Sequence, residues 1–200
     1  MANSGDVVNF DAIEGHKENI QSLPSGRSAK KLAALLSPRG PLEAVPTPTE
    51  IRNANDATRI QFETEIANID EYDDPLDVYH RYVQWTLDTY PSSQATPQSG
   101  LRTLLERATK AFVGSAQYRN DPRYVKLWVH YISFFSDAPR ETFVYLSRHG
   151  IGDGSALFYE EYAAWLEGAG RWAQADEIYR LGCEREAQPA ARLARKYREF

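Results

Sequence analysis

The tripeptide Lys17-Glu18-Asn19 places a cation, an anion and an amide side by side in a turn-rich segment that also contains Pro24. Together these three side chains suit a shallow polar pocket on a partner protein. A motif of this length matches by chance at a rate on the order of a few per cent in such a chain, so its context must decide its meaning. The tripeptide is a candidate recognition peptide, and a solvated turn is the alternative.

The rest of the chain offers little reactive chemistry. The four histidines lack the paired spacing of metal ligands, and the single cysteine, Cys183, has no motif around it that marks a nucleophile. Residues 150–154 are glycine-rich but lack the Lys-Ser or Lys-Thr ending of a phosphate loop, which favours a turn. We expect no catalytic site, no metal and no cofactor. A solvated helix face is the interpretation of the basic residues near the C-terminal end, Arg185, Arg192, Arg195, Lys196 and Arg198.

Composition sets the class of protein. A chain of 200 residues that is 42% hydrophobic can bury one good core, which predicts one domain plus a tail. Its formal charge of -5 argues against a general nucleic-acid partner, because neutralising phosphates needs a basic face. No apolar run approaches the length that a bilayer requires, so we expect no membrane partner.

Short amphipathic stretches flank the tripeptide. Before it, Phe10 and Ile13 have the spacing of one helical face. After it, Ser28 is a suitable N-cap for a helix with Leu32 and Leu35 along one side. Because so few apolar contacts cannot hold a helix alone in water, these helices would order on a partner. The alternative is that the leucines pack on the chain's own domain.

A proline-rich stretch divides the chain. Residues 37–49 contain four prolines, which restrict the residues before them and favour an extended linker. We therefore expect an N-terminal helix-loop-helix segment over residues 1–36, this linker, and a helical domain over residues 50–200.

The domain shows the signals of helices almost throughout. Phe62, Ile66 and Ile69 give one apolar stripe to its first long helix. Asp74-Pro75 and Asp121-Pro122 each combine an aspartate cap with proline in the first turn, so a helix should begin at each.

One spacing of aromatic residues occurs three times, and the residues are expected to be core. The triads are Tyr79-x-x-Tyr82-x-x-Trp85, Trp128-x-x-Tyr131-x-x-Phe134 and Tyr159-x-x-Tyr162-x-x-Trp165.

Second helices follow these triads. After the third, Ala175, Tyr179 and Gly182 keep the small, aromatic, small order of the second helix of a tetratricopeptide repeat. Leu101, Leu105 and Ala108 take those places after the first triad, whereas residues 139–149 fit poorly after the second. The sequence therefore predicts an all-α fold, a short tetratricopeptide-like solenoid of about three helical hairpins whose faces bind peptides or partner helices.

Several blocks of the chain together resemble the N-terminal homology region of the Bub/Mad spindle-checkpoint family, over about residues 15–200 with the linker unmatched. The blocks are Lys17-Glu18-Asn19 with Gly26-Arg27, Phe62-Glu63-x-Glu65-Ile66, Asp74-Pro75-Leu76-Asp77-Val78-Tyr79-x-Arg81-Tyr82-x-x-Trp85, Leu104-Leu105-Glu106-Arg107-Ala108, Asp121-Pro122-Arg123-Tyr124-x-x-Leu127-Trp128, Gly150-Ile151-Gly152 and Ala175-Asp176-x-Ile178-Tyr179.

The resemblance implies a pseudosubstrate inhibitor. Lys17, Glu18 and Asn19 would form a Lys-Glu-Asn (KEN) box presented to the WD-repeat co-activator of the anaphase-promoting complex, within a mitotic checkpoint complex. A HORMA-domain checkpoint protein would be a second partner. Contacts of the flanking segments with these partners would come from Phe10, Ile13, Arg27, Leu32 and Leu35.

The resemblance also implies docking by the repeat, in the nucleus and at kinetochores, and in the cytoplasm during mitosis. A kinetochore scaffold peptide would bind around Leu127, Trp128 and Tyr131, and a Bub protein is a further expected partner. One alternative is the kinetochore-targeting module of a Bub-type checkpoint kinase whose catalytic domain follows residue 200. Another is a half-tetratricopeptide scaffold of RNA processing.

Overall fold

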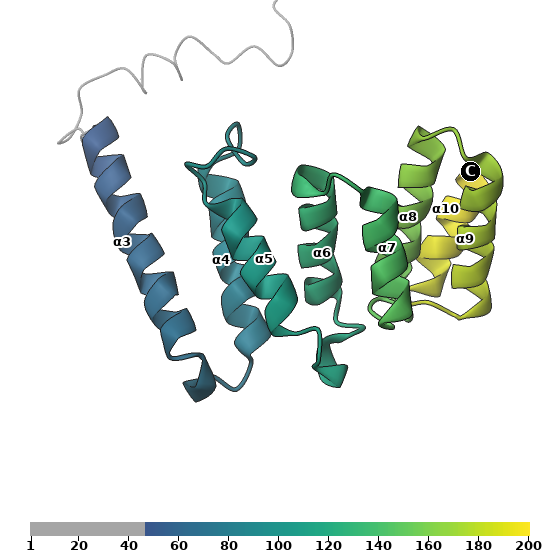
Figure 1. Ribbon diagram of the computed structural model, residues 1–200, viewed down its shortest axis with the longest axis horizontal. Helices are drawn as coiled ribbons and strands as arrows, with labels where there is room; N and C mark the ends of the chain where they lie inside the picture. Colours follow the sequence, from purple (N-terminus) through teal and green to yellow (C-terminus); the bar gives the residue numbers. More distant parts are fainter. Residues whose placement is uncertain (1–46) are drawn as a thin grey trace, which may run out of the picture. The chain divides into compact units, whose positions relative to one another are not determined.

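The computed structural model describes residues 47–200, within which Pro48–Phe200 form one compact unit. This unit is all-helical, with no β-strand among the described residues, which confirms the expected fold class (Figure 1). The predicted segments at residues 1–36 and most of the linker lie outside the described residues. The α-helices are α3 Pro48–Ala67, α4 Pro75–Thr89, α5 Leu101–Ala111, α6 Pro122–Phe135, α7 Pro139–Arg148, α8 Ala156–Gly168, α9 Trp172–Glu184 and α10 Ala190–Glu199, and the 3₁₀ helices are η2 Ile69–Glu71 and η3 Ala116–Tyr118.

Both helix starts predicted from Asp-Pro are confirmed, but the side chains of the two aspartates make different hydrogen bonds. Asp121 caps α6, because its Oδ1 accepts a hydrogen bond from the backbone N–H of Arg123 at 2.8 Å. Asp74 makes no side-chain cap to α4. Its Oδ2 instead accepts a hydrogen bond from Arg123 Nη1 at 2.6 Å, and the cap interpretation of Asp74 was wrong.

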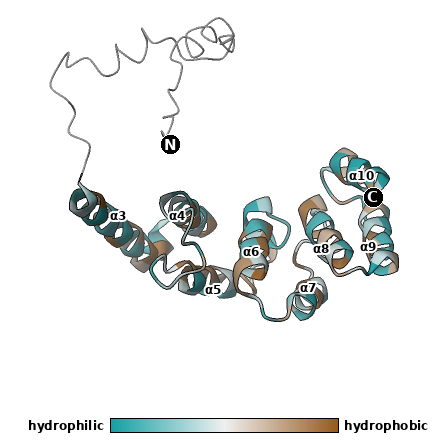
Figure 2. Cartoon of the chain, turned by 90° about the horizontal axis from the view of Figure 1, so that it is seen from above, coloured by the Kyte–Doolittle hydropathy of each residue, from teal (hydrophilic) through white to brown (hydrophobic). Residues whose placement is uncertain are grey.

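Consecutive helices pair and stack. α4 packs on α5, α8 packs on α9, and α6 bridges these pairs by contacting α4, α5 and α8. Within this unit α4, α6 and α8 lie on one side of the array and α5 and α7 on the other (Figure 2). α3 packs on α4 at one end, and α10 packs on α8 and α9 at the other. The arrangement is that of helical hairpins in a short solenoid.

The aromatic triads form the core, as predicted. Their first members, Tyr79, Trp128 and Tyr159, are all buried, whereas the third member of each triad is only partly buried. The stripe predicted for the first helix is divided: Phe62 and Ile66 lie in α3, but α3 ends at Ala67 and Ile69 belongs to η2. All three residues of this stripe pack against the core.

The glycine-rich segment at residues 150–154 is a turn between α7 and α8, as predicted. Gly152 has a φ of +83°, and its backbone N–H donates to Arg119 O at 2.8 Å. Gly154 donates from its backbone N–H to Asn120 Oδ1, also at 2.8 Å. The turn therefore fastens the start of α8 to the segment ahead of α6. None of the helices in residues 47–200 is long and apolar enough to span a bilayer.

Candidate functional site

The residues predicted to dock a kinetochore scaffold lie on α6 but differ in exposure. Leu127 is fully buried, so its side chain is part of the core and offers no surface to a partner. Trp128 is 7% exposed and packs edge-to-face on Tyr131, with ring centroids 6.0 Å apart. Its ring also lies near the buried Tyr124, at 6.4 Å, and near the exposed Tyr145 of α7, at 5.9 Å. Of the three, Tyr131 keeps the most surface for a partner.

The remaining predicted contacts lie outside the described residues. They are Lys17, Glu18 and Asn19 of the tripeptide and the flanking Phe10, Ile13, Arg27, Leu32 and Leu35.

A hollow of about 360 Å³ opens between α6, the start of α7, and α8. The buried Ile132 and Phe143 and the partly exposed Val129 and Trp165 give this hollow apolar surface, and its lining also includes the polar Ser133, Ser136 and Glu161. The apolar part of the lining suits an apolar side chain.

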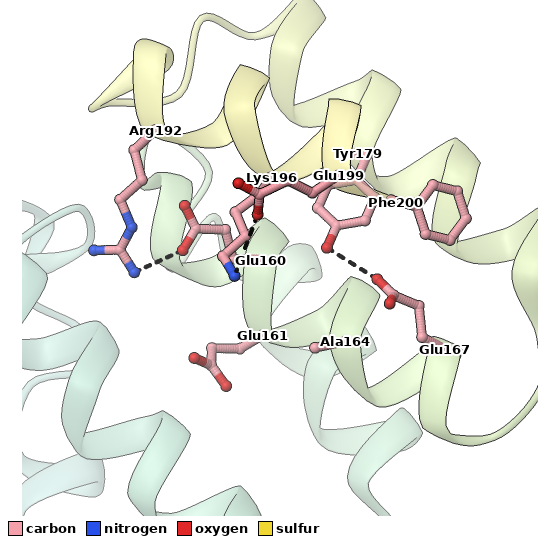
Figure 3. Close-up of a pocket in the computed structure, with 9 residues that line it drawn as sticks. All are labelled: Glu160, Glu161, Ala164, Glu167, Tyr179, Arg192, Lys196, Glu199 and Phe200. Carbon is pink, nitrogen blue, oxygen red and sulfur yellow. Dashed lines mark hydrogen bonds and ion pairs between the residues drawn. The ribbon is translucent and has the colours of Figure 1, made fainter.

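A second hollow of about 360 Å³ lies between α8, α9 and α10 (Figure 3). It is lined by four carboxylates, Glu160, Glu161, Glu167 and Glu199, with two cations, Arg192 and Lys196. Glu161 and Ala164 line both hollows, so the two hollows adjoin each other on this face of α8. We call the two adjoining hollows together the α8 groove.

Most charges of the α8 groove already have partners. Arg192 Nη2 lies 2.7 Å from Glu160 Oε2, and the Glu160 side chain is only 6% exposed. Tyr179 donates its hydroxyl to Glu167 Oε1 at 2.9 Å. Burial and this carboxylate both raise the pKa of the Tyr179 hydroxyl, so it remains a proton donor at neutral pH.

The basic C-terminal residues are exposed, as predicted, but two of them also pair with acidic side chains of other segments. Arg192, whose side chain is 49% exposed, lies against the buried carboxylate of Glu160. Arg185, whose side chain is 41% exposed, has its Nη1 2.8 Å from Asp153 Oδ1. Arg195, Lys196 and Arg198 are exposed on α10.

Glu161 is the exception in the groove. No hydrogen bond or ion pair joins its carboxylate to the described residues, and Figure 3 shows it pointing away from α10. Burial and the neighbouring charge of Glu160 raise its pKa, and the more weakly acting charges of Arg192 and Lys196 oppose this shift without reversing it. Sequence analysis missed this residue. The sequence shows two adjacent acids, Glu160-Glu161, inside the third aromatic triad, but not which of the two lacks a partner.

The α8 groove combines apolar surface with a carboxylate, which are groups that can contribute to binding by shape and charge. Within residues 47–200 no group of three or more His, Cys, Asp or Glu side chains could hold a metal ion.

The residues that define the fold match a known family model, Mad3/BUB1 homology region 1, over residues 57–183. The chain belongs to the Mad3/BUB1 family. The mitotic spindle checkpoint component mad3 of Schizosaccharomyces pombe is 39% identical over 193 residues, which are 96% of this chain and 59% of that protein. The mitotic checkpoint serine/threonine-protein kinase BUB1 beta of Mus musculus is 34% identical over 100% of this chain and 18% of its own length.

The Mad3/BUB1 fold also matches a solved structure. A chain in the crystal structure of the mitotic checkpoint complex superposes with a TM-score of 0.71 at 39% identity, covering 98% of this chain and 86% of that one. This chain spans about three fifths of the mad3 relative and under a fifth of the kinase relative. Membership in the Mad3/BUB1 family disfavours the RNA-processing alternative.

Proposed function

We propose that the chain is a spindle-assembly-checkpoint protein that inhibits the anaphase-promoting complex as a pseudosubstrate. Lys17, Glu18 and Asn19 bind the WD-repeat co-activator where its substrates' signals would bind, and a HORMA-domain protein completes the complex. The supporting observation is the reach of the similarity. The family model covers residues 57–183, but the match to mad3 covers 96% of the chain and so extends into the first 46 residues, which hold the tripeptide.

The flanking segments add to this binding. Phe10, Ile13, Arg27, Leu32 and Leu35 contact the partners, and ordering these segments on binding costs conformational entropy. Part of the affinity therefore depends on these residues as well as on the tripeptide. The protein acts in mitosis, in the nucleus and at kinetochores.

A binding titration against the purified co-activator propeller tests the proposal. The triple variant Lys17→Ala, Glu18→Ala, Asn19→Ala should lose at least about ten-fold in affinity, because truncating the central contacts of an interface removes most of its binding energy. The matched control replaces one lysine, one glutamate and one asparagine on the exposed surface, Lys110→Ala, Glu184→Ala and Asn53→Ala. Equal affinity of the two triple variants would exclude the pseudosubstrate role.

The kinetochore-targeting module of a Bub-type kinase is the second candidate. The similarity to a chain named as a kinase, BUB1 beta, favours it. In that case a kinetochore scaffold peptide docks on the repeat near Tyr131 and Tyr145, and substitution of Lys17, Glu18 and Asn19 leaves its affinity unchanged.

A further inference from the structure

The two ends of the α8 groove differ in chemistry. At the α6 end, Ile132, Phe143 and Trp165 contribute apolar surface to the hollow, beside the hydroxyls of Ser133 and Ser136. At the α10 end, four carboxylates face two cations, which leaves an excess of negative charge. The ends meet at Glu161 and Ala164. Ala164 is exposed, and its side chain is only a methyl group, so it forms a low boundary between the two hollows.

The balance of contacts makes Glu161 the available group. Arg192 is held by Glu160 at 2.7 Å, and Lys196 lies 3.9 Å from Glu199 Oε2. Glu161 keeps a half-buried carboxylate with no such partner among the described residues. Burial has removed part of the water around this carboxylate. A positively charged group of a ligand would therefore be stabilised beside it, because the ion pair compensates for the lost hydration.

We propose that the α8 groove binds a peptide segment of a partner protein, with a large apolar side chain in the α6–α8 hollow and a lysine or arginine on Glu161. The excess negative charge of the groove selects a basic segment, and the apolar surface fixes its orientation. The role is separate from that of the tripeptide at residues 17–19, so either can hold without the other.

The test uses the full 200-residue chain and short fluorescein-labelled peptides carrying one leucine and one lysine, in a polarisation titration. Matched peptides replace the lysine with glutamate or the leucine with serine. The leucine-lysine peptide should bind saturably, and both replacements should weaken it. Glu161→Gln should weaken it about five-fold, the scale of a partly exposed ion pair.

Reversing the charge of Glu161 gives a more discriminating experiment. Glu161→Lys should reverse the preference, so that the glutamate peptide binds better than the lysine peptide, which loss of folding cannot mimic. Ala164→Trp should fill the groove and abolish binding. The control Ala173→Trp adds the same side chain on an exposed position of α9 outside the groove and should bind as the wild type does.

Several outcomes would overturn the proposal. These are the absence of saturable binding to any probe, binding that survives Ala164→Trp, or an unreversed preference in Glu161→Lys. A dimer in sedimentation that Ala164→Trp dissociates would assign the groove to a second copy instead. The variant at Lys17, Glu18 and Asn19 should bind the probes normally, which separates this result from that for the pseudosubstrate role.

Discussion

Gly182 lies where α9 meets α8 and α10 at close range. A Cβ at this position would come within 2.6 Å of Tyr159 Cγ and 2.9 Å of Leu193 Cδ2. Both neighbours are almost fully buried, so neither can move without disturbing the core. The close packing of α8, α9 and α10 at this position thus explains why the repeat pattern requires a small residue here.

Gly182→Ala should therefore destabilise the protein. Overpacking costs about 1 to 3 kcal/mol, which exceeds the gain from the better helix propensity of alanine. Gly168→Ala is the matched control, because no atom lies within 4 Å of a Cβ there, and it should be neutral or slightly stabilising. Urea unfolding of both variants provides the measurement. Equal stabilities would mean that α9 shifts freely on α8.

At the scale of helices, local signals predicted more than distant ones. Asp-Pro marks the starts of α4 and α6 because capping and proline act within one turn. Such local signals could not predict the partner of Asp74, because Arg123 belongs to another helix, distant in the sequence. The same limit explains Leu127: helical spacing shows that residues share a face, but not whether that face is core or surface. Sequence analysis missed Glu161 because its lack of an ion-pair partner depends on how three helices pack together.

Arg123 joins α4 to α6 and makes stability depend on pH. Its guanidinium bonds Asp121 Oδ2 at 2.8 Å and Asp74 Oδ2 at 2.6 Å. Hydrogen bonding to Arg123 lowers the pKa of Asp121. For Asp74, burial opposes ionisation, but the bond and charge of Arg123 outweigh it and lower the pKa. Carboxylates with lowered pKa values stabilise the fold above about pH 4, and that contribution is lost as the pH falls.

Arg123→Gln should cost about 1 kcal/mol at neutral pH, a figure that allows for the solvent exposure of the pairs. The difference in free energy of unfolding between wild type and variant should narrow as the pH is lowered below about 4, because protonated aspartates no longer form the charged interaction. Arg195→Gln removes an exposed pair, 3.8 Å from Glu199, and serves as control with a gap near zero. Denaturant titrations across this pH range measure both gaps, and a constant gap for Arg123→Gln would contradict the linkage.

For the whole helical unit, stability should vary along the stack. In a solenoid each element contacts only its neighbours, so the terminal elements open more easily than the interior. α3 contains no fully buried residue, whereas α8 contains seven. Contacts of α3 with α4 and α5 include Phe62 stacked on Tyr82 at 4.8 Å and Glu63 paired with Arg107 at 3.0 Å.

Phe62→Ala should release α3 alone. Loss of this partly buried ring should lower the free energy of opening α3 by about 2 kcal/mol, which accelerates its amide exchange roughly thirty-fold. Exchange in α8 should hardly change, because α8 does not contact α3 and opens only with the remaining stack. Ile60→Ala, at a position 66% exposed on the same helix, is the control and should leave both rates near those of the wild type. Hydrogen exchange followed by mass spectrometry resolves the two helices. Equal acceleration in α3 and α8 would show that the unit opens as one body, and the nearest-neighbour account of the stack would then fail.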